Sequence, residues 1–595
     1  MPHKKVAALL TALLLALAVT FPIAPSAHAA TTDVTIETID TSAYDLTFSD
    51  RELEGTWEDR DTITVTATGD TFKASGKGAK LKDGQLYITA EGVYVISGSL
   101  TIPVVIEAGK KDKVQLVLQD VEIAVTDGPA IRIEEADKVF ITLPEGTTST
   151  ITDGAAYTDT DTGSPDAAIF SHTDLCFNGA GTLVVNGQYK HGIVSKDDLI
   201  VVSCTLEVNA ASTALDGKDC LMATGATITA NAGTNGLRSD NAEEEGRGFI
   251  YLHESTVTVV SDGDGIQAQT LLQVTGGKLH LTTGGGATKV LTNATGSWKG
   301  LKSAGDMLLE GDAEVVISSK DDCIHANRNV FISGGNYDLS SGDDGVHADT
   351  NLTVMDGTFY IRQSYEGMEA SRLMIAGGAI AIIASDDGLN AAGGKDGSAA
   401  GSRAGRGFFS NGIGEIIITG GYTWMNTNGD GIDSNGTILV TGGVTLVCGP
   451  TSSMNAAFDY DGTATVTGGI LIATGASGMA QNFSQAENQG AILLTFSKSI
   501  TAPVALVDEN GTVIASFAPL TKYQSIVITA PGIQRGGTYT FYTNAEVEGA
   551  DYFGFAQDTT FTGGTAGASI TMTSMIYGSG FGGFGGGSGG GPGGW

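Results

Sequence analysis

The chain of 595 residues carries 67 acidic and 32 basic side chains, which gives a net charge of −35, and 41% of its residues are hydrophobic. So acidic a chain repels nucleic acid, whose binding depends on lysine and arginine, while its apolar content is sufficient for a folded core. Composition therefore argues against a nucleic-acid-binding protein and against global disorder.

Residues 1–30 have the three parts of a secretory signal peptide. Lys4 and Lys5 form a basic start, residues 7–19 are apolar, and residues 27–29 (AHA) resemble a cleavage site of small residues. A membrane span would need about 20 apolar residues, which is more than this stretch provides. The sequence therefore predicts a secreted protein that acts outside the cell or at its surface.

Five cysteines remain in the chain, and their spacing matches no zinc-binding pattern. Most of them lie in apolar, strand-like stretches, so we expect buried free thiols. They are Cys176, Cys204, Cys220, Cys323 and Cys448.

A repeat of about 22 residues dominates the middle of the chain. Its marker is an acidic pair, a small residue and an apolar residue, as in DDCI (321–324), DDGV (343–346) and DDGL (386–389). Most steps between markers are close to this length, and the longer steps contain loop-like inserts such as residues 393–412. A fixed period of this kind is the signature of a stacked repeat fold.

Each period contains three short segments of alternating apolar residues, for example 346–348, 352–354 and 359–361. Alternation indicates strands with one buried face, and their enrichment in valine, isoleucine and threonine argues against a helical or leucine-rich solenoid. The sequence predicts an all-β fold: a right-handed parallel β-helix with about 22 residues per coil and a small C-terminal β unit. Glycine pairs such as Gly377-Gly378 are expected at its corners, because glycine tolerates positive φ.

These patterns divide the chain into five parts. Residues 31–86 form an N-terminal segment after the signal peptide, and residues 87–482 form the β-helix. Residues 483–575 read as hairpins of a C-terminal β unit, and residues 576–595 as a flexible glycine-rich tail.

Stacking would gather the acidic residues of the repeat on one edge. Residues at equal offsets in neighbouring coils lie about 4.8 Å apart. Calcium takes six to eight oxygen ligands, so aligned carboxylates beside turn carbonyls suit Ca²⁺. The alternative is that each aspartate caps its own turn. The predicted calcium ligands are Asp262, Asp264, Asp321, Asp322, Asp343, Asp344, Glu366, Asp386, Asp387 and Asp430.

A second set of residues suggests a carbohydrate-binding face. Tyr360 lies two coils, or about 10 Å, from Tyr422 and Trp424 on the outward side of the third strand, a spacing on the scale of a disaccharide. Exposed aromatic rings on a flat sheet suit stacking on sugar rings, unless the insert after Gly393 covers them. His325 and His347 point outward from the first strand, where they can contact hydroxyl groups, share a metal or belong to an ordinary solvated face.

The order of motifs resembles a known family. The stretches GVYVISGSL, VQLVLQDVEI, YKHGIVSKDDL, GLRSDNAEEEGRGFIYL, GDGIQAQTLLQVTGG, SDDGLNAAGG and GDGIDSNGTILVTGG are together similar to the secreted bacterial carbohydrate-binding domain-containing proteins. The resemblance covers about residues 87–531. It implies a pectate-lyase-like parallel β-helix, bound calcium and binding of cellulose or acidic pectic chains of the plant cell wall, without lytic activity. Trp298 and Lys299 replace the acids of one coil, which we expect to lack calcium.

Two other functions stay open at this point. A pectate-type lyase would need calcium and a basic residue to remove a proton, and Lys302 and Arg328 are the nearest basic residues to the acidic edge. A surface adhesin or structural spacer is the third reading. We expect a polysaccharide partner, no nucleic acid and no membrane span.

Overall fold

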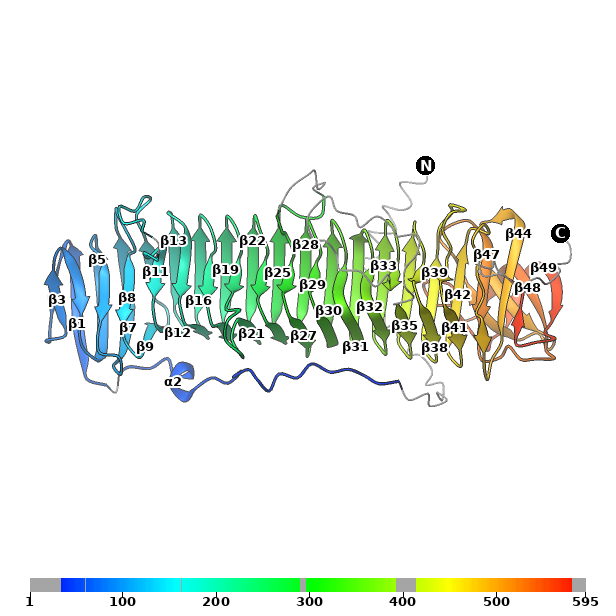
Figure 1. Cartoon of the computed structure of the whole chain (residues 1–595), viewed down its shortest axis with the longest axis horizontal. Helices are drawn as coiled ribbons and strands as arrows, with labels where there is room; N and C mark the ends of the chain where they lie inside the picture. The colour runs from blue at the N-terminus through cyan, green and yellow to red at the C-terminus, as the bar shows by residue number, and fades with distance from the viewer. Residues whose placement is uncertain (1–33, 59, 162, 289–295, 392–413, 580–595) are drawn as a thin grey trace.

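The structure is a computed structural model that describes residues 34–58, 60–161, 163–288, 296–391 and 414–579. Within these residues it is all-β, and its one helix is α2 (Asp50–Leu53). Figure 1 shows the strands side by side in one long row. No described helix has the length and apolar character needed to cross a membrane. The predicted signal peptide and most of the predicted tail lie outside the described residues.

Parallel pairing sorts the repeating strands into three columns. β14 (His191–Ser195) pairs with β17 (Leu215–Gly217), three strands further along the chain, and Ile193 lies opposite Leu215. The offset is the predicted 22 residues, and the neighbouring strands follow the same rule. The prediction of an all-β fold with a long run of parallel strands is therefore confirmed.

The first column follows the marker of each coil. It consists of β8 (Ile131–Glu135), β11 (Ala167–Ser171), β14, β17, β20 (Leu237–Ser239), β23 (Ile266–Ala268), β26 (Leu301–Ser303), β29 (Ile324–Ala326), β34 (Leu389–Ala391), β37 (Ile432–Ser434) and β40 (Asp459–Tyr460). The second column consists of β9 (Lys138–Leu143), β12 (Asp174–Gly179), β15 (Asp198–Val202), β18 (Cys220–Thr224), β21 (Phe249–His253), β24 (Leu271–Thr275), β27 (Asp306–Glu310), β35 (Glu415–Ile418), β38 (Thr437–Val440), β41 (Thr463–Val466) and β43 (Gln485–Ala486).

The third column precedes the marker. It consists of β10 (Thr148–Thr152), β13 (Thr182–Gly187), β16 (Thr205–Ala210), β19 (Thr227–Ala232), β22 (Thr256–Ser261), β25 (Lys278–Thr283), β28 (Glu314–Ser319), β33 (Ala379–Ala384), β36 (Tyr422–Thr427), β39 (Val444–Cys448) and β42 (Ile470–Gly475). Three long strands each contribute to more than one column: β30 (Asn329–Ser341), β31 (Val346–Ser364) and β32 (Met368–Ile375).

Inward side chains from the three columns form one core along the stack. Ile324, Val346 and Met368, at equivalent positions of successive coils, are fully buried. Burying an aliphatic side chain of this size contributes about 1.5–3 kcal/mol. A one-residue slip would turn the whole set outward, so the alternating pattern also sets the register.

The small marker residue is explained by close approach of the backbone. A Cβ on Gly367 would lie 2.3 Å from the carbonyl oxygen of Gly388, and one on Gly345 would lie 2.6 Å from that of Gly367. Glycine pairs serve a different need, because the second glycine of each pair has positive φ, 84° at Gly378 and 77° at Gly421.

The parallel stack reaches back to residue 62, because β1 pairs in parallel with β5. The first strands also include two antiparallel hairpins, β1–β2 and β3–β4. Their bounds are β1 (Thr62–Gly69), β2 (Thr71–Ala74), β3 (Ala79–Lys82), β4 (Gln85–Ile88), β5 (Gly92–Leu100), β6 (Val104–Glu107) and β7 (Lys113–Ala124).

An extended segment, residues 34–56, runs along the outside of the stack, and we call it the N-terminal strap (Figure 1). The Arg372 guanidinium donates to the Thr35 carbonyl oxygen (3.1 Å), and the side-chain amide of Asn178 donates to the Glu52 carbonyl oxygen (3.2 Å). Between these anchors, four apolar strap residues pack on outward residues of the second column. The strap residues are Ile39, Tyr44, Leu46 and Phe48, and the column residues include Phe140, Cys176, Ile200, Cys220, Met222 and Phe249.

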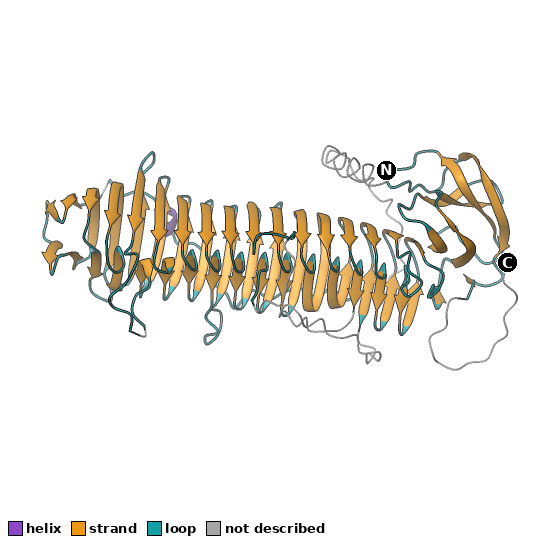
Figure 2. Ribbon diagram, turned by 90° about the horizontal axis from the view of Figure 1, so that it is seen from above, coloured by secondary structure: helices purple, strands orange, loops and turns teal. Residues whose placement is uncertain are grey.

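The C-terminal β unit covers the third column at the far end of the stack. Its four-stranded antiparallel sheet has the order β46 (Val513–Phe517), β45 (Val504–Asp508), β48 (Thr538–Val547) and β49 (Phe561–Thr571), and lies to one side of the stack in Figure 2. β47 (Tyr523–Thr529) joins it to the stack by pairing with β42 and with β44 (Ala491–Ile500), which also pairs with β50 (Ile576–Tyr577).

All five cysteines are free and buried, as expected. Burial raises the pKa of the Cys204 thiol to about 12, so it stays protonated and unreactive at neutral pH. Cys204 and Cys323 lie in the core, whereas Cys176 and Cys220 lie beneath the strap.

Deleting residues 34–55 should therefore expose the two thiols beneath the strap while leaving the core thiols protected. We expect iodoacetamide to label Cys176 and Cys220 in the truncated protein under native conditions, and to label neither of them in the intact protein. Mass spectrometry of the peptides provides the readout, with Cys204 and Cys323 as internal controls. Equal protection of Cys176 and Cys204 after truncation would show that the strap is not the cover.

Candidate functional site

Six of the predicted acidic residues form one column at the corner before the first strands. We call this column the carboxylate ladder. All of its members except Glu366 are at most 5% exposed. The ladder consists of Asp264, Asp322, Asp344, Glu366, Asp387 and Asp430.

The five aspartates of the ladder each accept a backbone N–H of the next coil. The Asp344 backbone N–H donates to Asp322 Oδ1 (3.0 Å), and the Glu366 N–H donates to Asp344 Oδ1 (3.2 Å). The Asp430 N–H bonds to Asp387 Oδ1 in the same way (2.6 Å). The alternative that each acid caps its own turn does not describe these bonds. Hydrogen bonds to a charged acceptor contribute roughly 1.5–3 kcal/mol each, so the ladder ties successive coils together.

A second row of polar side chains lies beside the ladder, three residues further on in each coil. We call it the outer row, and its members are paired in register along the first column. The outer row consists of Lys302, His325, His347, Glu369, Asn390 and Asp433. Together the two rows form the acidic edge.

Lysine side chains neutralise the first part of the acidic edge. Lys299 is fully buried, and its Nζ lies 3.1 Å from Asp321 Oδ1 and 2.6 Å from Asp322 Oδ2. Burial would raise the pKa of Asp322, but Lys299 and the histidines hold it below its usual value. Lys302 Nζ contacts Asp264 Oδ2 at 3.0 Å. The coil expected to lack calcium thus carries an ammonium group of the protein among its carboxylates.

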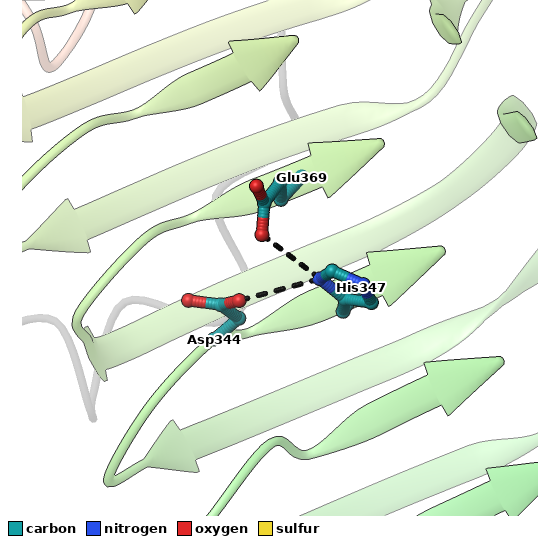
Figure 3. Close-up of side chains that lie close together, drawn as sticks. All are labelled: Asp344, His347 and Glu369. Carbon is teal, nitrogen blue, oxygen red and sulfur yellow. Dashed lines mark hydrogen bonds and ion pairs between the residues drawn. The ribbon is translucent and has the colours of Figure 1, made fainter. Parts of the chain in front are cut away.

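The two histidines occupy the middle of the acidic edge, where their rings stack at 4.8 Å. His347 Nδ1 lies 2.9 Å from Glu369 Oε2 and 3.4 Å from Asp344 Oδ2, as Figure 3 shows. Its Nε2 lies 3.1 Å from Asp349 Oδ1. Burial opposes the charge, yet these three carboxylates together raise the pKa of His347 well above its ordinary value. His347 is therefore a third built-in cation, after Lys299 and Lys302.

The predicted role of the histidines in sugar contact is wrong. His325 is 2% exposed and His347 is fully buried, so neither can meet a polysaccharide at the surface. His325 instead contacts Asp322 Oδ2 through Nδ1 (2.8 Å) and Asn327 Oδ1 through Nε2 (2.9 Å).

The last part of the acidic edge is the most crowded with carboxylates. Ligand oxygens of Asp387, Asp430 and Asp433 lie within 4.8 Å of one another. Burial, together with the charges of Glu369 and Asp387, raises the pKa of Glu366 well above its ordinary value.

Asn390 supplies a further oxygen to this crowded part. Its side-chain amide donates to Glu366 Oε2 (2.6 Å), while its Oδ1 is buried and has no hydrogen-bond partner among the described residues. Carboxylate and amide oxygens are the ligands of hard cations such as Ca²⁺, so this end of the acidic edge fits that ion.

The remaining predicted ligands lie around the ladder. Carboxylate oxygens of Asp321, Asp322 and Asp343 lie within 4.8 Å of one another, close to the Lys299 ammonium group. Asp386 is half-buried and Asp262 is exposed.

The expected aromatic face is aligned but not exposed. Tyr360 lies opposite Ala381, which lies opposite Trp424, as predicted. However, the C-terminal unit covers the row: Phe553 stacks on Trp424 at 4.9 Å between ring centroids, and the Tyr422 hydroxyl donates to Asp551 Oδ2 (2.6 Å). Tyr422 and Trp424 are 4% and 6% exposed, and Tyr360 is half-buried against the same cluster. The prediction that these rings stack on sugars is therefore wrong.

Sequence reasoning missed an acidic cluster on the second column, formed by Asp174, Asp197 and Asp198. Burial, Asp174 and Asp198 raise the pKa of Asp197 to about 6. Arg247 Nη1 contacts Asp198 Oδ1 at 3.0 Å. The signal was present in the sequence, because TDL (173–175) and DDL (197–199) recur 24 residues apart.

Comparison with known proteins supports the resemblance drawn from the motifs. Residues 82–345 match the model of a family described as carbohydrate-binding domain-containing protein. A protein of that description from Acetivibrio thermocellus is 28% identical over 211 residues, which are 35% of this chain and 74% of the relative. A solved structure titled as a polysaccharide lyase-like protein from C. thermocellum, a gadolinium derivative, is 25% identical. It covers 42% of this chain and 99% of its own, with a TM-score of 0.39. The family resemblance is thus confirmed for residues 82–345.

Replacing Lys299 with methionine should strongly destabilise the protein, because Asp321 and Asp322 would remain buried without its ammonium group. Removing one partner of a buried ion pair costs about 3–5 kcal/mol. Urea unfolding provides the measurement, and the double variant K299M/D322N should recover part of the loss. The control Lys278→Met removes an exposed pair with Glu314 and should cost less than about 1 kcal/mol. Equal losses in the two single variants would contradict the role of Lys299.

Proposed function

We propose that the protein is a secreted, non-catalytic polysaccharide-binding protein, stabilised by calcium at its acidic edge. The proposal is carried by the match of residues 82–345 to a carbohydrate-binding domain family. The partner is a polysaccharide of the plant cell wall, cellulose or an acidic pectic chain. Secretion rests on the signal peptide predicted at residues 1–30.

We further infer that the three columns close into a right-handed parallel β-helix. Each coil contributes one strand to each column, and one continuous core lies among the columns. Right-handed crossovers are strongly preferred between parallel strands, which supports this hand.

Calcium is assigned to the crowded end of the acidic edge. There Glu366, Glu369, Asp387, Asp430 and Asp433 bring carboxylates together, and Asn390 Oδ1 is an additional oxygen (see above). A bound divalent cation would offset the repulsion that raises the pKa of Glu366. In the earlier coils, Lys299, Lys302 and His347 bring positive charge to the carboxylates.

The contacts of the two candidate catalytic bases, Lys302 and Arg328, argue against lyase activity. A basic residue that removes a proton from sugar must be within hydrogen-bond reach of it. Lys302 is held by Asp264 and Ser297, and the Arg328 guanidinium is held by Asp306. Lys302 and Arg328, the two candidate bases named from the sequence, are therefore both engaged in ion pairs.

The proposed function predicts that the protein binds a polysaccharide without cleaving it. The chain lacking residues 1–30 is incubated with insoluble cellulose and, separately, with polygalacturonate in calcium. We expect the protein to sediment with at least one polysaccharide while the ultraviolet absorbance of unsaturated sugar stays flat. A rise in absorbance would establish lyase activity, and failure to bind either polysaccharide would refute the proposal. Bovine serum albumin serves as the non-binding control.

The calcium assignment predicts that the variant Glu366→Gln is more stable than the parent protein in EDTA and less stable than it in calcium. The pKa of Glu366 is higher in the folded than in the unfolded protein. Ionisation of this carboxyl group at high pH therefore lowers the free energy of unfolding. At low pH the group is protonated in both states, so it no longer affects the free energy of unfolding. In EDTA at pH 8 the variant should be more stable than the parent by roughly 1 kcal/mol. This advantage should disappear on acidification below about pH 4. In calcium the order should reverse, because the variant has lost a ligand.

Thermal unfolding followed by circular dichroism measures both conditions. Glu207→Gln, on the exposed face of β16, is the control and should show no inversion. Identical unfolding curves of the parent protein in EDTA and in calcium would contradict the assignment.

A further inference from the structure

A groove opens along the third column at a distance from the acidic edge's crowded end. Its volume is about 730 Å³, and its lining comes from five successive coils, through β10, β13, β16, β19 and β22. Of these strands, β13, β16, β19 and β22 lie side by side in Figure 1. All of its residues fall within the segment that matches the carbohydrate-binding domain family.

One side of the groove is a ladder of amide side chains. Asn231 Nδ2 donates to Asn209 Oδ1 (3.0 Å), and Asn209 Nδ2 donates to Asn186 Oδ1 (3.1 Å). Asn186 Nδ2 continues the row to Thr152 Oγ1 (3.2 Å). These bonds hold the amides in fixed orientations before any ligand arrives.

The amide ladder retains hydrogen-bonding capacity. An asparagine side chain has two N–H donors and an oxygen with two lone pairs. Each bond along the row uses one N–H of the donating amide and one lone pair of the accepting oxygen. Asn209 and Asn231 are exposed, and Asn231 Oδ1 accepts no hydrogen bond from the described residues. The row therefore offers donors and acceptors at intervals of one coil, about 4.8 Å, which is comparable with one sugar unit of an extended glycan.

The rest of the lining admits a flat, uncharged ring. Small residues leave the backbone accessible, and Val260, which is 51% exposed, continues the column next to Asn231 as an apolar contact. The small residues are Gly187, Ala210, Ala211, Ala232 and Gly233.

The charges around the groove distinguish between neutral and acidic polysaccharides. Asp262 is the charged residue of the lining, and neither lysine nor arginine contributes to it. The position before the marker is uncharged in two of these coils, where Thr213 and Asn235 stand in place of the ladder acids. A polyuronate, with a carboxylate on every sugar, would meet no positive charge here.

We propose that this groove binds a neutral, extended glycan chain laid along the stack, with its hydroxyl groups bonded to Asn186, Asn209 and Asn231. This inference rests on the proposed polysaccharide-binding function and narrows it to one site and one class of ligand. The calcium of the acidic edge then stabilises the scaffold without touching the sugar.

The test compares the parent chain with the double variant N209A/N231A. Binding to cellulose and to a soluble cello-oligosaccharide is measured by sedimentation and by calorimetry, and polygalacturonate is measured alongside. The double variant should bind the neutral ligands about tenfold more weakly, because two sets of hydrogen bonds are lost. The control Thr229→Ala, on the same face of β19 but outside the groove, should bind as the parent does.

A second variant keeps the test decisive if the double variant unfolds. Ala211→Glu places a charged side chain at an exposed position of the lining and should weaken neutral-glycan binding to a similar extent. Circular dichroism confirms folding of each variant.

Each outcome bears on one of the two proposals. Binding of neutral glycan that the groove variants leave unchanged would overturn the groove while the proposed function stands. Binding of polygalacturonate alone would overturn the neutral ligand, again leaving polysaccharide binding intact. Binding of neither ligand would overturn both.

Discussion

Superposition of one coil on the next is the constraint on which the rest of the structure depends. Parallel pairing at a 22-residue offset places equivalent residues of successive coils opposite one another, as Ile193 opposite Leu215. Close backbone approach at Gly345 and Gly367 allows the corners to follow the same path as the strands. Whatever side chain the repeat carries at a given offset therefore becomes a continuous row. Core, carboxylate ladder and amide ladder are three consequences of this geometry.

The chemistry of each row follows from the residue type that the repeat places there. A row of amides is self-complementary, because an asparagine can donate to one neighbour and accept from the other, as Asn209 does between Asn186 and Asn231. A row of carboxylates repels itself, so it requires backbone N–H groups and cations. The chain supplies both in the first coils, where Lys299 lies among buried acids. For the crowded coils toward Asp433 we propose calcium, because carboxylate oxygens converge there.

Additional segments decide which rows face solvent. The N-terminal strap covers the apolar outward row of the second column, and the C-terminal unit covers the aromatic row at Tyr422 and Trp424. Both covers come from parts of the chain remote in sequence from the rows that they bury. Neither segment contributes to the lining of the groove, and Asn209 and Asn231 are exposed there. This is the physical reason that binding is assigned to the groove and not to the aromatic residues.

The sequence by itself determined the period, the alternation of apolar residues, the alignment of acids and the free buried thiols, because each depends on local spacing and on repetition. It also placed Tyr360 and Trp424 correctly in one row. Only the tertiary structure decided their exposure, since Phe553 lies more than a hundred residues away along the chain. Likewise, the burial of His347 among Asp344, Asp349 and Glu369, and the donation of Asp344 N–H to Asp322, depend on contacts between coils. Repetition fixes which residues become neighbours, whereas solvent access and charge state depend on how the non-repeating segments pack against the stack.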